Sequence, residues 1–355
     1  GEIMMERPRS LTVWGRGPRP GPTWRTAVGF GLVVLILALL LEGWWILTVP
    51  GPLRAGPRVV EIPAHKGVVE VAEILDDAGV IRSRVGFVLL SLARGSFRSL
   101  KAGEYQIPAG TNTVRVLELM EGGQVFQHMV VFQEGSTLGE LARQLQTERL
   151  AAAEDILRVG KDPVFLKTLD IQADSVEGYL FPDTYQFVKG MTPEEVLARM
   201  IARMREKISP ELLQDARHRD LTVHQLLTLA SIIEKEAVEP AEMPLISAVF
   251  WNRLKRDMPL QADPTVQYAV GKDRKRLTRE DLQADSPYNT YRRQGLPPGP
   301  IASPGRAAIQ AAARPASVGY LYFVATDDRH HQFSTNLADH NAAVARYRLA
   351  RTNTK

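Results

Sequence analysis

Residues 27–47 read AVGFGLVVLILALLLEGWWIL, and the organisation of the chain follows from this apolar run. As a helix it would span about 32 Å at about 1.5 Å per residue, which matches the hydrocarbon core of a bilayer. Trp24 precedes the run, and Trp44 and Trp45 lie near its end, where indole rings favour the membrane interface. The sequence therefore predicts one membrane-spanning helix, with a cleaved signal peptide as the alternative.

Basic residues dominate the segment before the span. Glu2 and Glu6 are outnumbered there by arginines, namely Arg7, Arg9, Arg16, Arg19 and Arg25. The positive-inside tendency predicts a cytoplasmic N-terminus and an extracytoplasmic body. No small-x-small cleavage site follows the run, because Pro50-Gly51-Pro52 stands there instead. We therefore expect a single-pass anchor in the cell's plasma (inner) membrane rather than a removed signal peptide.

The composition is that of a folded protein with several domains. The chain has 355 residues, of which 45% are hydrophobic and 24% charged, so we expect two or three domains. It has no cysteine, which excludes disulfides and thiol chemistry. The residues beyond the span are close to neutral, so the sequence has no electrostatic footprint for nucleic acid.

The predicted fold class is α+β, because helical and strand-like segments are mixed without strict alternation. The predicted parts follow the chain in this order: a disordered cytoplasmic tail at 1–26, a transmembrane helix at 27–47, a linker at 48–58, a small module at 59–131 and a larger mixed α+β domain at 132–350. The tail and the linker are assigned from their high Pro and Gly content.

The module at 59–131 has the pattern strand, helix, helix, strand. Residues 59–63 and 103–107 favour strands, and residues 68–78 and 83–94 have helical spacing of apolar side chains. This βααβ order resembles the LysM glycan-binding module in topology. A spacer domain that binds nothing is the alternative.

The larger domain is predicted to contain more helix than strand. Residues 129–132 and 320–324 favour strands, and the second of these precedes a polar loop. Helices are expected at 137–147, 193–207, 222–237, 242–256 and 337–348.

Residues 176–185, VEGYLFPDTY, form the first stretch that could carry chemistry. Glu177 lies among Tyr179, Phe181 and Tyr185, and a carboxyl beside aromatic surface has a raised pKa and can act as a general acid near neutrality. Aromatic rings also stack on sugar faces. The alternative from these residues alone is a loop glutamate next to a tight turn.

Two further sets of residues are polar in unusual places. In ASIIEKEA, residues 230–237, helical geometry puts Glu234 at the border of the apolar face, where it needs a partner or a role, while Glu236 is expected to be a solvated surface charge. The stretches LQADPTVQY (260–268), SPYNTY (286–291) and GLPPGPI (295–301) are expected to form shaped loops. Their amide, hydroxyl and aromatic groups suit sugar hydroxyls and N-acetyl groups, or alternatively pack on the core.

Taken in order, EGYLFPDTY, ASIIEKEA, VFWNRLKRDMPLQADPTVQYAVG, SPYNTYRRQGLPPGPIASPG and YLYFVA resemble the MltG (YceG-like) family of endolytic murein transglycosylases. The likeness covers roughly residues 59–350. It implies that Glu177 is the catalytic glutamate. The tail HHQFSTNLADHN is similar to the family's ending but has Asp339 in place of a glutamate, which leaves any role of His331 open.

The resemblance implies cleavage of the MurNAc–GlcNAc bond within nascent peptidoglycan strands, which leaves 1,6-anhydro-MurNAc ends and terminates strand elongation. Two alternatives are a muramidase that hydrolyses the same bond and a non-catalytic glycan-binding scaffold. Besides Glu177, the candidate substrate-binding residues are Tyr179, Asp183, Glu234, Gln261, Tyr288 and Asn289. The expected partners are peptidoglycan strands and the membrane, with peptidoglycan synthases as further candidates.

No cofactor and no metal are expected. His330, His331 and His340 are close in sequence, but there is no HExxH helix and a polar loop explains them more simply. The sequence also lacks GxSxG, P-loop and Rossmann motifs.

Overall fold

The computed structural model describes residues 24–52, 56–63, 65–271, 276–327 and 329–353. The chain forms two compact units, one of residues 1–101 and 105–124 and the other of residues 102–104 and 125–355. Both units mix helices with short strands, so the predicted α+β composition is confirmed. The predicted tail at 1–26 falls almost entirely outside the described residues.

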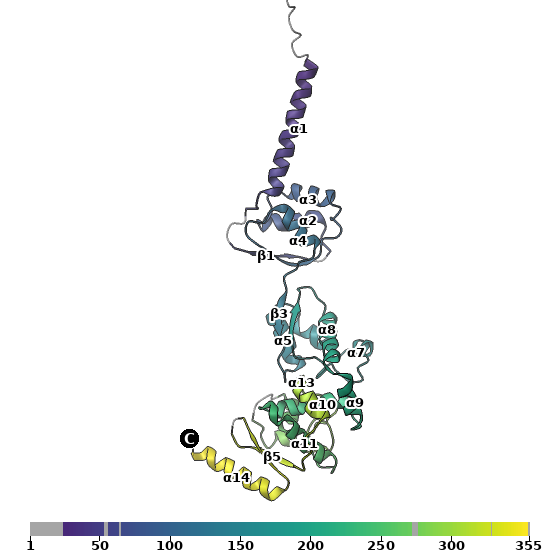
Figure 1. Ribbon diagram of the computed structural model, residues 1–355, viewed down its shortest axis with the longest axis vertical. Helices are drawn as coiled ribbons and strands as arrows, with labels where there is room; N and C mark the ends of the chain where they lie inside the picture. The colour runs from purple at the N-terminus through teal and green to yellow at the C-terminus, as the bar shows by residue number, and fades with distance from the viewer. Residues whose placement is uncertain (1–23, 53–55, 64, 272–275, 328, 354–355) are drawn as a thin grey trace, which may run out of the picture. The chain divides into compact units, whose positions relative to one another are not determined.

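The first unit contains a long apolar helix and a small module, as Figure 1 shows. Helix α1 spans Trp24–Thr48, and within it Thr26–Thr48 has a mean hydropathy of 2.4 with its apolar side chains exposed. By length and composition α1 could cross a membrane. The elements of the module are β1 (Arg58–Ile62), α2 (Val68–Asp77), α3 (Arg84–Ala93), β2 (Gly103–Ile107) and α4 (Thr113–Glu121).

The predicted order strand, helix, helix, strand is found in this module, and α4 follows it. Strands β1 and β2 pair in a two-stranded sheet. The core of the module is apolar and includes Leu75, Phe87, Tyr105 and Leu117, all nearly fully buried. The kinship with LysM modules stays a prediction.

The second unit is mainly helical, with two small antiparallel sheets. Strand β3 (His128–Val131) pairs with β4 (Thr184–Phe187), and β5 (Tyr322–Ala325) pairs with β6 (His331–Ser334). Its helices are α5 (Leu138–Thr147), α6 (Ala153–Val159), α7 (Pro163–Thr168), α8 (Pro193–Lys207), α9 (Pro210–Arg217), α10 (Val223–Glu236), α11 (Met243–Leu254), α12 (Asp263–Val270), α13 (Arg306–Ala313) and α14 (Leu337–Asn353), with 3-10 turns at Pro240–Glu242 and Asp281–Gln283.

Helix α10 is the centre of this unit. Every residue from Leu226 to Ile233 is buried, so the helix is covered on all sides rather than along one stripe. Thr222 caps its start, accepting a hydrogen bond from the Gln225 N–H while the Gln225 side chain accepts one from the Thr222 N–H. The loops that pack against α10 therefore contact a helix that is buried in the core of the unit.

Two expectations about loops were wrong. Residues 260–268 were expected to form a shaped loop, but Asp263–Val270 is helix α12, since Asp263 and Pro264 suit the first turn of a helix. The polar stretch after residue 324 was expected to be a loop, but His331–Ser334 is strand β6 and pairs with β5. In both cases the element is too short to show a clear period in the sequence.

Candidate active site

A cavity of about 280 Å³ in the second unit contains the side chain of Glu177. It lies between the start of α5, the turn before α7, the loop before β4 and helix α12. Glu177 is the one carboxyl group among the described residues that line it. The lining residues are Thr137, Leu138, Gly139, Leu157, Lys161, Ser175, Glu177, Lys235, Pro264, Gln267, Tyr268, Gly271 and Ile301.

The Glu177 carboxyl group is bound to the N-terminus of helix α5. The Leu138 N–H donates to Oε1 at 3.0 Å and to Oε2 at 3.2 Å, and only 8% of the residue is exposed. The free N–H groups of a helix start favour negative charge. The neighbouring cap is complete, because the Thr137 hydroxyl accepts from the Glu140 N–H and the Glu140 side chain accepts from the Thr137 N–H. The carboxyl group is therefore held in one orientation by backbone.

Burial raises the pKa of Glu177 to about 7, against the hydrogen bonds from the Leu138 and Gly178 backbones, which lower it. Glu140 adds a smaller raising effect, and the Lys161 ammonium opposes it. A carboxyl group with this pKa is present in both protonation states near neutral pH. It can donate a proton and take one back within one reaction.

Two tyrosines form an aromatic wall beside Glu177. The rings of Tyr268 and Tyr288 lie 5.0 Å apart, and Tyr268 lines the cavity. Burial, and then the charge of Glu177, raises the pKa of both phenols. Such rings can pack against the apolar face of a sugar. Tyr288 was predicted as a binding residue, whereas Tyr268 was not singled out although its motif was.

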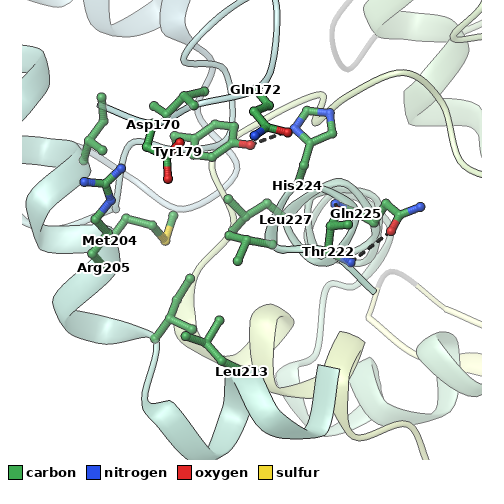
Figure 2. Close-up of a pocket in the computed structure, with 14 residues that line it drawn as sticks. Asp170, Gln172, Tyr179, Met204, Arg205, Leu213, Thr222, His224, Gln225 and Leu227 are labelled. Atoms are coloured by element: carbon green, nitrogen blue, oxygen red, sulfur yellow. Dashed lines mark hydrogen bonds between the residues drawn. The ribbon is translucent and has the colours of Figure 1, made fainter. Parts of the chain in front are cut away.

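Tyr179 does not line this cavity but faces a second one of about 640 Å³, shown in Figure 2. Its hydroxyl lies 2.8 Å from His224 Nδ1, and His224 Nε2 lies 2.7 Å from the Pro298 carbonyl oxygen. A carbonyl only accepts, so the proton on His224 Nε2 is donated to Pro298, and a ring protonated at Nε2 alone accepts from the tyrosine at Nδ1. Burial raises the pKa of Tyr179 to about 12. His224 thus links the loop of Glu177 to the segment around Pro298.

Gly178 strengthens the same link. Its φ of +79° is left-handed, and a Cβ at this position would lie 2.2 Å from Pro300 Cβ. The Ile301 N–H in turn donates to the buried Ser231 hydroxyl of α10 at 3.1 Å. The loop that carries Glu177 therefore packs on residues 298–301, and Ile301 is bonded to the central helix α10.

The other predicted binding residues have structural partners. Glu234 accepts from the Gly305 N–H at 2.9 Å, at the start of α13, and burial raises its pKa. Asp183 pairs with Arg203 at 2.7 Å, and this hydrogen bond lowers the carboxyl pKa although partial burial opposes it. Neither residue lines the Glu177 cavity.

Asn289 and Gln261 also serve the loops. Asn289 is fully buried, and its amide donates to the Leu282 and Ala284 carbonyls while its oxygen accepts from the Tyr291 N–H. Both N–H donors of the Asn289 amide are therefore used within the protein, and its side chain is buried. The Gln261 side chain lies 3.4 Å from an Arg253 nitrogen.

Glu236 corrects an expectation. It was expected to be a solvated surface charge, but it is partly buried, and burial followed by the charge of Asp263 raises its pKa to about 8. Arg253 opposes this increase. Glu236 does not face solvent as expected because α12, which was not predicted, begins at Asp263 beside the end of α10.

The three histidines near the C-terminus each have a different partner. His331 Nδ1 lies 2.7 Å from Glu242, His330 pairs with Asp327, and His340 stacks on Tyr322. Among the residues that the structure describes, no group of three or more His, Cys, Asp or Glu side chains could hold a metal ion.

A buried carboxyl with a pKa near neutrality, facing a cavity with an aromatic wall, has the properties that general acid–base chemistry needs. The comparisons with known proteins agree with a site of this kind. The model of the YceG-like family matches residues 60–346, and the chain therefore belongs to this family.

Named relatives cover most of the chain. A protein of Bacillus subtilis (strain 168) named "Endolytic murein transglycosylase" is 34% identical, over 81% of this chain and 84% of that protein. A protein of the same name from Streptococcus pneumoniae serotype 2 (strain D39 / NCTC 7466) is 33% identical over 88% of this chain, but the match spans only 64% of that protein. A crystal structure of a YceG-like protein from Listeria monocytogenes has a TM-score of 0.57 at 34% identity, covering 81% of this chain and 98% of that one.

Proposed function

We propose that this protein is a peptidoglycan lytic transglycosylase, a lyase that cleaves the MurNAc–GlcNAc bond within glycan strands. Three features support the proposal: membership of the YceG-like family, relatives named endolytic murein transglycosylases, and the site at Glu177. The observation that carries it is the lone carboxyl group of Glu177 among the described residues of its cavity. Hydrolysis by a glycosidase normally needs two carboxyl groups across the scissile bond.

One carboxyl is enough when the sugar supplies the nucleophile. Protonated Glu177 donates its proton to the glycosidic oxygen as the bond from MurNAc C1 to that oxygen breaks. The resulting carboxylate takes the proton of the MurNAc C6 hydroxyl as O6 bonds to C1. The products are a free GlcNAc hydroxyl and a 1,6-anhydro-MurNAc end, and Glu177 is protonated again. The Leu138 N–H stabilises the carboxylate in the intermediate state.

The aromatic wall and polar side chains of the cavity would hold the strand. We assign Tyr268 and Tyr288 to contact with sugar faces, and Gln267 to hydrogen bonding with hydroxyl or N-acetyl groups. The contacts of Tyr179, Asp183, Glu234, Gln261 and Asn289 support positioning of the loops rather than direct binding.

We further propose that α1 anchors the protein in the plasma membrane with its N-terminus in the cytoplasm. The length and hydropathy of α1, its terminal tryptophans and the preceding arginines support this orientation. In this arrangement residues 132–350 are the catalytic domain on the extracytoplasmic side, and residues 59–131 are a LysM-like glycan-binding module. Cleavage would then act on nascent, membrane-proximal strands and end their elongation, close to peptidoglycan synthases.

Digestion of isolated peptidoglycan in water enriched in heavy oxygen tests the reaction. The full-length protein in detergent should release glycans with 1,6-anhydro ends that carry no label. Free reducing ends that carry the label would identify a muramidase instead. Binding to the glycan without soluble products would identify a scaffold.

A further inference from the structure

Helix α3 has an apolar face that no described residue of its own unit covers. Val85, Leu89 and Leu92 are 67%, 60% and 48% exposed, and their spacing of four and three residues puts them on one side of the helix. Phe87 and Ser91 are buried on the opposite side, against the module. At about 100° per residue, Leu89 points about 160° away from Phe87. The helix is thus apolar toward the core and also away from it.

The place of α3 in the first unit is fixed by contacts with the last turns of α1. A Cβ at Gly86 would lie 3.2 Å from Ile46 Cγ2, so the two helices touch where α3 has no side chain. Arg82 lies 4.8 Å from the ring centre of Trp45 and donates to the Pro50 carbonyl at 2.8 Å. The contact residues Trp45 and Ile46 belong to the segment long and apolar enough to cross a membrane. Helix α3 is therefore level with the end of that segment.

Further hydrogen bonds connect the module to the end of α1 and the residues after it. The Asn112 amide donates to the Thr48 carbonyl at 3.1 Å, and the Gly51 N–H donates to the Thr111 carbonyl at 3.0 Å. The start of α4 therefore holds the end of α1 from another side. Figure 1 shows α3 beside the lower end of α1, with β1 on the far side of the module.

We propose that α3 lies in the membrane interface, with Val85, Leu89 and Leu92 inserted among lipid acyl chains next to α1. The inference rests on the membrane anchoring proposed above and goes beyond it, because it seats the whole module on the bilayer. Trp44 and Trp45, at the end of α1 that α3 contacts, are 69% and 53% exposed. Indole rings at this position mark the level of the headgroups.

A lipid surface fits this face better than a protein partner does. A helix of 10 residues that packs one side on its own module and exposes aliphatic side chains on the other can lie in the plane of the interface. Arg94, at the C-terminal end of α3, pairs with Glu118 and Glu121 of α4. Arg98 follows it and can reach lipid phosphates while its aliphatic stem stays on the apolar side. If α3 faced water instead, three aliphatic side chains would stay hydrated although a bilayer lies within reach, which is the less favourable state.

The chain has no cysteine, so single cysteines can be labelled without background. The full-length variants Leu89→Cys, Val59→Cys and Leu37→Cys would carry an environment-sensitive NBD label. Each would be reconstituted in nanodiscs of phosphatidylglycerol and phosphatidylethanolamine, with and without lipids spin-labelled near the acyl carbonyl. Val59 on β1 is the matched control, because it is also aliphatic and is 50% exposed. Leu37 reports on α1 itself.

The proposal predicts blue-shifted emission and strong quenching by the spin-labelled lipid at position 89, and emission typical of water with little quenching at position 59. Equal emission and quenching at 89 and 59, with position 37 blue-shifted, would overturn the seating of α3 and leave the anchor intact. A label at position 37 in an aqueous environment would overturn the anchor as well. Blue-shifted emission at position 89 without lipid-dependent quenching would indicate a protein contact and would also refute the proposal.

Discussion

In the proposed reaction, the carboxyl of Glu177 gives up a proton and takes one back in the same turnover. Its environment suits both steps, because burial favours the protonated form while the Leu138 and Gly178 backbones favour the carboxylate. An exposed glutamate with an ordinary pKa would be almost fully ionised at neutral pH and a poor acid. The value of about 7 is therefore a property of the fold, and pH dependence can test it.

We expect kcat/KM to fall as the pH rises above about 7, because the first step needs protonated Glu177. The same shift affects folding. The folded pKa lies above the unfolded value, so the stabilising effect of the protonated form is complete below the unfolded pKa and is lost as the pH rises through about 7. The unfolding free energy of Glu177→Gln, measured relative to that of the wild type, should therefore rise by about 2–3 kcal/mol from pH 4 to pH 8.

Chemical denaturation of the wild type and Glu177→Gln across this pH range measures the difference. A parallel pH dependence of the two proteins would show that Glu177 has an ordinary pKa. The control is Glu154→Gln, which changes an exposed carboxyl of α6 and should follow the wild type throughout.

Arg253 has a structural role that substitution can expose. It is buried and donates to the Leu321 carbonyl at 2.8 Å and the Leu260 carbonyl at 2.7 Å, and it faces Glu236. We expect Arg253→Met to lower the unfolding free energy by about 3 kcal/mol, because it leaves buried carbonyls unpaired and Glu236 without its opposing charge.

Arg158→Met is the matched control, since Arg158 lies on the surface of α6 and its pair with Asp155 is largely exposed. Its expected cost is below about 0.5 kcal/mol. Urea titrations of both variants decide the point, and similar losses would argue against a special role of Arg253.

Among elements, the loop of Glu177 depends on its fit against residues 298–301. Gly178→Ala adds a Cβ that would meet Pro300 at 2.2 Å in a left-handed backbone, so we expect a loss of about 3 kcal/mol and most of the activity. Gly190→Ala has the same backbone problem, with φ +91°, but nothing within 4 Å. It should cost about 1 kcal/mol and leave activity intact. Thermal unfolding and turnover of the two variants separate fit from backbone strain, and equal effects would contradict the account.

The sequence predicts the long elements better than the short ones. The bounds of α8 are confirmed, because a Thr-Pro start, a clear period and basic residues at the end agree. Helices α6, α7, α9, α12 and α13 have at most eight residues and show too few turns to reveal a period. Strand β4 has four residues, and its partner β3 lies far away in sequence, so its pairing leaves no local sign.

The site shows the same limit. Glu177 was singled out by its motif, and the structure places it in a cavity. Its hydrogen-bond donor is the backbone of Leu138, 39 residues away, and a backbone amide has no signature in the sequence. Tyr268 could have been selected from its motif, whereas Lys161 lies in no recognised pattern. The neighbours that convert Glu177 into an acid are products of tertiary packing.

At the scale of the molecule, the chain combines a helix long and apolar enough to cross a membrane with a second unit that contains the Glu177 cavity. Every described residue that lines the Glu177 cavity belongs to the second unit. We therefore expect a form beginning at Pro50 to keep most of the activity on isolated glycan. In cells lacking the native protein, an exported soluble form should fail to restore normal glycan strand length. Full rescue by that form would contradict a role for the anchor in substrate access.

The central claim is that the Glu177 carboxyl performs the proton transfers. Mass spectrometry of the 1,6-anhydro ends released from isolated peptidoglycan tests it most directly, with wild type, Glu177→Gln and Glu154→Gln compared at equal concentrations of folded protein. We predict that Glu177→Gln still binds the glycan but releases at least about 1,000-fold fewer ends, while Glu154→Gln matches the wild type. Substantial release of anhydro ends by Glu177→Gln would contradict the account.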